Sequence, residues 1–356
     1  MKIAQLVVNT LPNTSYRYTT ELNKQLLKLG YEADIISIND IDFNENFCIK
    51  LNTYEYCFIH SLPKSNDIYL KLINRIKIKK FLFITDMNIK QWHNSISLSN
   101  IQNLLRASSN IVINELATDI INEIEHLISK TACEEKLVNL KYIYDYSNLS
   151  FNNVDNKKKE ISLISNKGVI ANYELFLNLF QRNNNLDLIW HIYGVTKNIQ
   201  TMSVNNLYVN KETSQKSLIT NFSSTIEKGK VNVHGMIDEC TCNDIISSNL
   251  FIANFDVTSI LSYTLLDIIG NGTIPILHKD IAQRIKINKS QSLYDLKCGI
   301  YIDSKSSNDE TLIQINKLLS SKNTYLQFIN KNIKIFNQLF NIESIINDLL
   351  INLKIK

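Results

Sequence analysis

The chain has 356 residues, a formal net charge of +4, and ordinary shares of hydrophobic (44%) and charged (20%) residues. That length suggests about two domains, and the scarcity of glycine (8) and proline (3) excludes collagen-like and linker-like chains. The mild positive charge permits an anionic partner such as nucleic acid. It does not demand one, because a nucleic-acid footprint is usually a clustered basic patch.

The six cysteines are scattered, and Cys240 and Cys242 are the only close pair. No second Cys or His pair at zinc spacing accompanies them, so the sequence predicts neither a disulfide framework nor a bound metal. The chain shows no apolar run of membrane-spanning length, and it opens on an apolar strand, residues 3–8, instead of a secretory leader. We therefore expect a cytoplasmic protein with no membrane partner.

The first half of the chain alternates short apolar runs with amphipathic segments. The apolar runs, which predict buried strands, are residues 3–8, 32–37, 56–60, 80–85 and 110–114. Helices are expected over 18–29, which Gly30 closes, and over 115–128. Alternation of this kind predicts parallel strands joined by crossover helices.

Residues 147–160 are rich in Asn, Asp, Ser and Lys, which predicts a linker. The alternation then restarts, with strands expected at 161–164, 186–193, 231–234, 249–253, 273–277 and 299–302, and helices at 169–182, 259–269, 309–319 and 325–353. The sequence thus predicts an α/β protein with two Rossmann-like domains, 1–150 and 151–325, that face a cleft. A helical tail, 326–356, is expected to pack back toward the first domain. The same pattern fits other two-lobed α/β proteins.

Ligands of open parallel sheets bind at the carboxyl ends of the strands. The helix predicted over 259–269 starts at such an end, and its N-terminus suits a diphosphate, with Ser259 and Ser262 adding hydroxyl donors. Asp267 lies further along the same helix, where its carboxylate could accept both hydroxyls of a ribose. An ordinary surface Asp is the alternative interpretation.

The run from Tyr263 to Asp267, followed by Gly272 to Pro275, resembles the signature of retaining GT-B glycosyltransferases. It is most similar to the DNA α-glucosyltransferases of T-even phages, which transfer glucose from UDP-glucose to 5-hydroxymethylcytosine in duplex DNA. The resemblance covers residues 245–345 and is faint elsewhere. It implies that Tyr263 and Asp267 bind the donor, although Asp267 is one methylene shorter than the Glu that binds ribose in the family.

Lys167 and Gly168 resemble the pair that opens the first helix of the donor domain in such enzymes. There the Lys neutralises the diphosphate, which gains charge as the leaving group departs. A solvated loop lysine is the alternative. The family has an Arg five residues earlier, where this chain has Ser162. Gly194 ends a predicted strand at which the family commonly contacts the nucleotide through the backbone.

On the acceptor side, Asp86 matches the Asp of a His-Asp pair that faces the acceptor in the phage enzymes. The resemblance implies that Asp86 is catalytic and orients or deprotonates the acceptor hydroxyl; a helix or turn cap is the alternative. Thr85 stands where the family has the His, and a hydroxyl cannot replace an imidazole in proton transfer. Arg17, at the entry of the first helix, could contact a phosphate.

Arg75, Lys77 and Lys79 form the best basic cluster of the N-terminal half. They alternate with Ile76 and Ile78, so an extended chain would place the three cations on one face. The cluster is a candidate surface for double-stranded DNA, in which the target base would have to be flipped out. A solvated approach to the next strand is the alternative.

The leading hypothesis is a retaining hexosyltransferase of a phage-infected cell. It would move a sugar, glucose by resemblance, from a UDP-sugar to a hydroxymethylated pyrimidine in DNA, with no bound cofactor. A glycosyltransferase of the same fold that acts on polysaccharide is an alternative. A non-catalytic relative that binds or scaffolds a partner is another, because the Arg expected at Ser162 and the His expected at Thr85 are missing. The oligomeric state is open.

Overall fold

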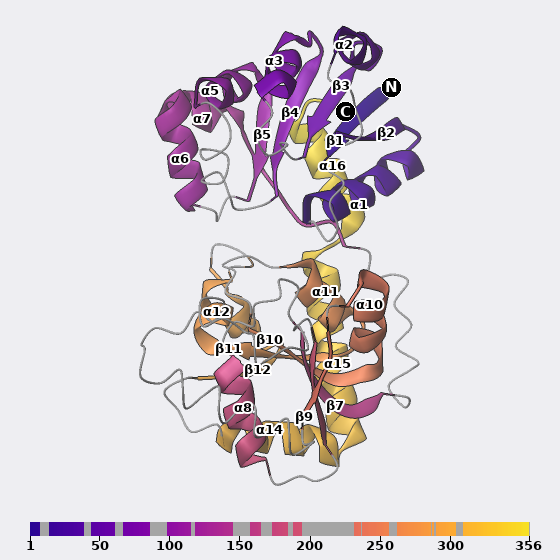
Figure 1. Cartoon of the computed structure of the whole chain (residues 1–356), viewed down its shortest axis with the longest axis vertical. Helices are drawn as coiled ribbons and strands as arrows, with labels where there is room; N and C mark the ends of the chain where they lie inside the picture. The colour runs from indigo at the N-terminus through magenta and orange to yellow at the C-terminus, as the bar shows by residue number, and fades with distance from the viewer. Residues whose placement is uncertain are drawn as a thin grey trace. The chain divides into compact units, whose positions relative to one another are not determined.

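The computed structural model describes residues 1–7, 14–38, 44–60, 67–85, 98–114, 118–144, 157–164, 173–183, 188–193, 231–235, 237–255, 262–285, 287, 290–303 and 309–355. The chain forms two compact units. Unit 1 comprises Met1–Asp145 together with Phe340–Lys356, and unit 2 comprises Tyr146–Leu339. In each unit a parallel sheet is flanked by helices (Figure 1).

Unit 1 is built on a six-stranded parallel sheet in the order β2-β1-β3-β4-β5-β6. Its strands are β1 (Lys2–Val7), β2 (Glu32–Ser37), β3 (Tyr56–Ile59), β4 (Lys79–Ile84), β5 (Asn110–Ile113) and β6 (Leu137–Asn139). Its helices are α1 (Thr14–Lys28), α2 (Glu45–Leu51), α3 (Asp67–Arg75), α5 (Leu98–Ala107), α6 (Thr118–Ile128), α7 (Lys130–Lys136) and α16 (Ile342–Asn352). Because helices cover the sheet, the inner strands are buried almost throughout.

Unit 2 is built on a second six-stranded parallel sheet, in the order β12-β11-β10-β7-β8-β9. Its strands are β7 (Lys158–Ile164), β8 (Ile189–Tyr193), β9 (Val231–Val233), β10 (Asn249–Asn254), β11 (Ile274–His278) and β12 (Ile300–Ile302). Its helices are α8 (Tyr173–Arg182), α10 (Glu239–Ser248), α11 (Tyr263–Gly270), α12 (Lys279–Arg284), α13 (Leu293–Leu296), α14 (Asp309–Ser320) and α15 (Lys322–Leu339).

The strand order of unit 2 indicates where on the sheet a ligand would bind. The chain starts in the middle of the sheet at β7, runs outward to β9, and returns to β10 before running outward to β12. This is the doubly wound Rossmann order, whose switch point lies between β7 and β10. In unit 1 the corresponding switch point lies between β1 and β3. The α/β class with parallel sheets that the sequence predicts is therefore confirmed.

Several elements differ from their predicted bounds; the first helix, for example, begins at Thr14 instead of Tyr18. The segment expected to be a linker ends in strand, because β7 already begins at Lys158. The single helix expected over 325–353 is two helices, α15 and α16, and the Asn341 side chain caps the second by accepting from Ser344 N at 3.0 Å. The helix expected to begin at Ser259 begins at Tyr263.

Lys157 forms hydrogen bonds that connect the start of β7 with the end of α10 and the start of β11. Its Nζ donates to Ser247 O (2.8 Å) and Asn249 O (3.2 Å) at the end of α10, and to Thr273 Oγ1 (2.7 Å) ahead of β11. A cation at a helix C-terminus also complements the helix dipole. Burial nevertheless lowers the pKa of Lys157 to about 7.

Several expectations from composition concern the molecule as a whole. All six cysteines are free thiols. Within the described ranges, no cluster of three or more His, Cys, Asp or Glu side chains is arranged to hold a metal ion. The helices in the same ranges are too short or too polar to reach across a bilayer.

Candidate functional site

The switch point of unit 2 carries the N-terminus of α11. Strand β10 ends at Asn254, and α11 follows with Ser262 as its N-cap in an extended conformation. The Ser262 Oγ accepts from Leu265 N at 3.2 Å, so this hydroxyl caps the helix instead of standing inside its first turn as predicted. A helix N-terminus that follows the carboxyl end of a central strand is the kind of place at which anions bind.

Asp267 is a buried carboxylate on α11, 6% exposed, between the fully buried Leu266 and Ile268. The alternative of an ordinary surface Asp is therefore wrong. Burial of a carboxylate is costly unless the group is paired or hydrogen-bonded, and Asp267 has a polar partner within the protein, so ligand binding by Asp267 stays a prediction. The helix ends as Asn271 N donates to Asp267 O at 2.9 Å, and Gly272 (φ 66) then turns the chain toward β11.

The other predicted donor residues fall into two groups. Tyr263 opens α11 and is buried. Lys167, Gly194 and Ser259 lie outside the described residues. Their place in the donor site stays a prediction.

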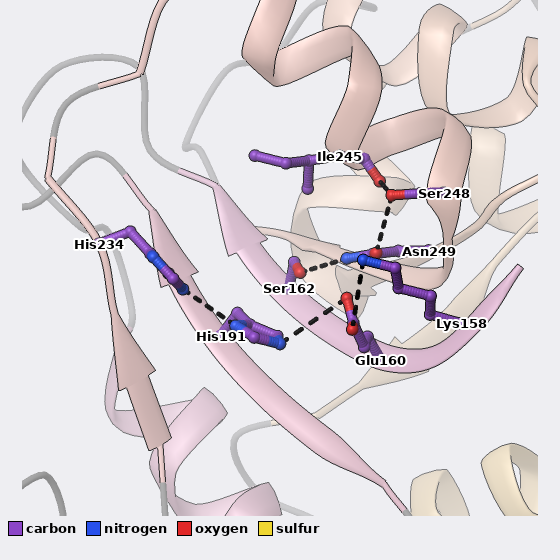
Figure 2. A network of polar contacts seen from close by, with 8 residues as sticks. All are labelled: Lys158, Glu160, Ser162, His191, His234, Ile245, Ser248 and Asn249. Carbon is purple, nitrogen blue, oxygen red and sulfur yellow. Dashed lines mark hydrogen bonds and ion pairs between the residues drawn. The ribbon is translucent and has the colours of Figure 1, made fainter. Parts of the chain in front are cut away.

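Ser162, which stands where the resembling family has an Arg, lies in the centre of the sheet. It is fully buried on β7, and Asn249 Nδ2 donates to its Oγ (Figure 2). A small hydroxyl with a side-chain partner thus fills this position. The closed packing explains why no cation is found here, since a buried guanidinium would need a carboxylate or several carbonyls around it.

In unit 1 a buried polar cluster lies at the carboxyl ends of β1, β3 and β4. The Thr85 Oγ1 and the Ser15 Oγ of α1 are 2.6 Å apart. Beside β1, His60 Nε2 is 3.0 Å from Gln5 Oε1. Burial lowers the pKa of His60 to about 3, so this imidazole stays neutral at physiological pH. Asp86, the predicted catalytic residue, directly follows Thr85 in the sequence and lies outside the described residues.

The four predicted nucleic-acid contacts lie at two separate places of unit 1. Arg17 is in the first turn of α1, at the carboxyl edge of the sheet, with its guanidinium 5.8 Å from the Tyr144 ring centroid. Arg75, Lys77 and Lys79 are exposed, as their alternation with isoleucines predicts. They flank the amino end of β4, the opposite edge from Thr85.

The position of Arg75, Lys77 and Lys79 at the amino edge of the sheet has a physical explanation that does not involve DNA. Helix C-termini lie at the amino edge of a parallel sheet, and α3 ends at Arg75. Cations there complement the helix dipole whether or not DNA is present. Because Arg17 lies at the carboxyl edge of the sheet, the structure does not bring Arg75, Lys77 and Lys79 together with it.

Sequence reasoning missed a second polar network, which crosses three strands of unit 2 (Figure 2). Glu160 on β7 faces His191 on β8, with Oε2 3.7 Å from Nε2. His191 Nδ1 is 3.0 Å from His234 Nε2, just beyond the end of β9. The His234 ring in turn stacks on Tyr193, with centroids 4.3 Å apart and planes at 10°. The residues are far apart in sequence, and only the strand register, which pairs Ser162 with His191, could have linked them.

Two tandem doubly wound units define the architecture of GT-B proteins, and comparison with solved structures agrees. The whole chain superposes on an α-glucosyltransferase in complex with UDP-glucose and DNA containing an abasic site, with a TM-score of 0.74, 13% identity and 99% of each chain covered. A complex of such an enzyme with UDP and a 13-mer DNA containing a HMU base gives 0.72 at 14% identity, covering 100% of each chain.

A third similar structure is the Anabaena protein HepE in complex with UDP and glucose, at a TM-score of 0.59, 10% identity and 99% coverage of each chain. No protein-family model and no curated protein sequence matches the chain. At such low identities the similarity establishes the fold, and the fold is GT-B, as the resemblance in the sequence implies.

Proposed function

We propose that the chain is a glycosyltransferase that takes its sugar from a nucleotide-sugar donor. The observation that carries the proposal is the similarity of the entire chain, at 99% coverage in both directions, to an α-glucosyltransferase complex with UDP-glucose and DNA. The site geometry of unit 2 supports it. A helix N-terminus at the switch point suits the diphosphate, and the buried Asp267 suits a sugar hydroxyl.

The donor in this proposal is UDP-glucose, and unit 2 binds it. The α11 N-terminus, with Ser259, Ser262 and Tyr263, takes the diphosphate, and Lys167 compensates the charge that UDP gains as it leaves. Asp267 accepts from hydroxyls of the ribose, and the backbone at Gly194 approaches the nucleoside. No step of this scheme requires a resident cofactor.

The acceptor in this proposal is a hydroxymethylated pyrimidine in duplex DNA, and the reaction retains the anomeric configuration. Asp86 orients or deprotonates the hydroxymethyl group. Of the basic residues, Arg17 is the better candidate for a DNA phosphate, because it lies at the carboxyl edge of its sheet. Charge reversal of Arg17 should therefore weaken DNA binding more than charge reversal of Arg75 or Lys77, measured as the duplex Kd at fixed salt.

A turnover assay tests the proposal. UDP-glucose labelled in the sugar is incubated with duplexes that contain 5-hydroxymethylcytosine, 5-hydroxymethyluracil or unmodified cytosine, and the label on DNA is counted. Asp267→Asn and Lys167→Ala should each lower transfer at least tenfold, whereas Lys159→Ala, at an exposed residue of β7, should not. If the wild-type chain binds no nucleotide sugar, the proposed function is wrong.

A second candidate function is binding without catalysis, and Thr85 favours it. The Thr85 hydroxyl is buried and engaged with Ser15, at the position where the resembling enzymes carry a His. Such a protein would bind a UDP-sugar and neither hydrolyse it nor transfer it to any DNA. Label released as free glucose or found on DNA would exclude this alternative.

A further inference from the structure

A cavity of about 170 Å³ lies within unit 1, beside the C-terminal helix α16. One face of α16 forms part of its wall, because the lining residues Ile345, Asp348, Leu349 and Asn352 recur at the spacing that places side chains on one side of a helix. Helix α1, which lies beside α16 in Figure 1, and the end of β6 supply the rest. We call this space the α16 cavity; its remaining lining residues are Tyr18, Asn139 and Lys141.

Tyr18 brings a buried hydroxyl to the wall of the α16 cavity. The residue is 1% exposed. Its ring packs against His60 and Phe83, with centroids 6.0 Å away in both cases, so the hydroxyl is the end that is left for the cavity. Within the part of the chain that the structure describes, this hydroxyl makes no hydrogen bond. A buried tyrosine hydroxyl ordinarily has a partner, so Tyr18 holds an unused donor and acceptor at the cavity wall.

The Tyr18 hydroxyl stays protonated at physiological pH. Burial raises the pKa of Tyr18, and the neighbouring Tyr142 raises it further. Tyr142 directly follows Lys141 of the lining, so the Tyr18 side chain reaches toward the segment after β6. A neutral phenol both donates to and accepts from an uncharged hydroxyl group.

The charges of the lining cancel. Lys141 Nζ and Asp348 Oδ2 are 3.3 Å apart, and both side chains are half exposed. Among the described residues that line the cavity, these two are the only charged ones. The lining therefore has no net charge that would attract a phosphate or a metal cation. The ammonium and the carboxylate still have hydrogen-bonding capacity to offer, as have the amides of Asn139 and Asn352.

Ile345 and Leu349 give the same cavity an apolar part, since they are 5% and 6% exposed. Aliphatic surface next to uncharged or charge-balanced polar groups suits a sugar ring, whose C–H groups meet the aliphatic side chains while its hydroxyls meet the polar ones. A nucleobase fits less well, because it gains most from stacking on an aromatic face, and Tyr18 offers only its hydroxyl end. The volume limits the occupant to one ring, since pockets for drug-sized ligands enclose about 300–1,000 Å³.

We propose that the α16 cavity binds one neutral hexose ring, with the Tyr18 hydroxyl as a direct contact and with Ile345 and Leu349 against the carbon atoms of the ring. The cavity belongs to unit 1, whereas the proposed donor site belongs to unit 2. The inference therefore goes beyond the proposed function and does not depend on it. Because the sugar touches α16 as well as α1 and the segment after β6, its binding should hold the helix in place.

Binding of the methyl glycosides of glucose, galactose and mannose tests the inference. At least one of them should bind with a Kd of about 1 mM or below, an ordinary affinity for a ligand of this size, measured by calorimetry. The same sugar should slow hydrogen exchange of the amides of Ile342–Asn352. Tyr18→Phe removes only the hydroxyl and should raise the Kd about fivefold to tenfold. Leu349→Phe fills part of the cavity and should raise the Kd further.

Matched controls separate binding in the α16 cavity from binding elsewhere and from folding. Tyr16→Phe alters a partly buried tyrosine of α1 that is outside the lining, and it should leave the Kd unchanged. Asp267→Asn, in the proposed donor site, should leave it unchanged as well. Because the Tyr18 hydroxyl has no hydrogen bond to lose, Tyr18→Phe should keep the urea midpoint of the wild type, whereas loss of a structural phenol would lower it.

The outcomes decide the inference separately from the proposed function. If none of the three glycosides binds at about 10 mM, the cavity holds only water and the inference is overturned. It is also overturned if Tyr18→Phe and Leu349→Phe bind the sugar as the wild type does, or if Asp267→Asn loses it. The proposed function is judged by transfer from UDP-glucose to DNA, so either proposal can fail alone.

Discussion

Replacing Lys157 with methionine should destabilise unit 2 by about 2 kcal/mol at high pH. At high pH the folded side chain is a neutral amine with two N–H donors, which can serve two of its three neighbours, Ser247 O at 2.8 Å, Asn249 O at 3.2 Å and Thr273 Oγ1 at 2.7 Å. Each of the two hydrogen bonds is worth about 1 kcal/mol net. Methionine keeps the apolar stem of the side chain, so the loss reports the bonds rather than the packing.

The cost of this substitution should depend on pH. Burial lowers the pKa of Lys157 to about 7, whereas in an unfolded chain it is about 10.4. Between these values the unfolded chain binds a proton that the folded chain does not, so the stability contributed by Lys157 rises with pH. Below pH 7 both states are charged, and the cost of burying the charge outweighs the hydrogen bonding, so the methionine variant should be the more stable protein there. The variant lacks this titration.

Urea unfolding between pH 6 and pH 10 measures both effects. Trp190 is buried in unit 2 and reports on that unit in a Trp92→Phe background, because the sequence has only these two tryptophans. The free-energy difference between the wild type and Lys157→Met should grow with pH, with a slope approaching about 1.4 kcal/mol per pH unit. Lys159→Met, at an exposed neighbour, is the control. A difference that stays flat or shrinks as the pH rises would refute the reasoning.

Substitutions at three further positions test other contacts of unit 2 with the same unfolding assay. Gly299→Ala should cost about 1–3 kcal/mol, because a Cβ there would lie 2.8 Å from Pro275 O; a neutral result would show that β11 and β12 yield freely. Tyr325→Phe removes the donor that reaches Gly272 O at 2.6 Å and should cost about 1–2 kcal/mol, unless water replaces the phenol. Ser262→Ala removes the α11 cap and should cost about 1 kcal/mol, whereas Ser262→Asp should retain most of the stability.

The strands of both sheets could be read from the sequence because they are buried on both faces. Runs such as 81–84 and 274–277 are apolar at almost every position, and few other structures bury every residue of so short a run. Helices α3 and α5 were missed. So were the short helices α2 and α7. Each has only 7 residues and buries one or two side chains, so no helical period develops.

Charged residues hid the beginning of one strand. Lys158 and Lys159 read as linker, yet they are the exposed amino end of β7, whose buried part starts only at Ile161. The break between α15 and α16 was not predicted either. It contains no Gly or Pro to mark it, and α16 starts at an Asn cap, Asn341.

The candidate site was predictable only where it is local in sequence. Asp267 and the α11 N-terminus lie within one strand–turn–helix unit, so a single motif contains both. Glu160, His191 and His234 come from β7, from β8 and from the position directly after β9, and only the pairing of these strands brings the three side chains together. The burial that makes His60 a neutral imidazole is a tertiary property in the same way.

The assignment of Phe340–Lys356 to unit 1 has a consequence for biosynthesis. Helix α16 buries Ile345, Ile346, Leu349 and Leu350 in a unit whose other part ends at Asp145. The ribosome makes all of unit 2 in between, so the unit translated first is completed last. Until α16 arrives, its docking surface stays open to solvent and to chaperones, although unit 2 can already close its own sheet.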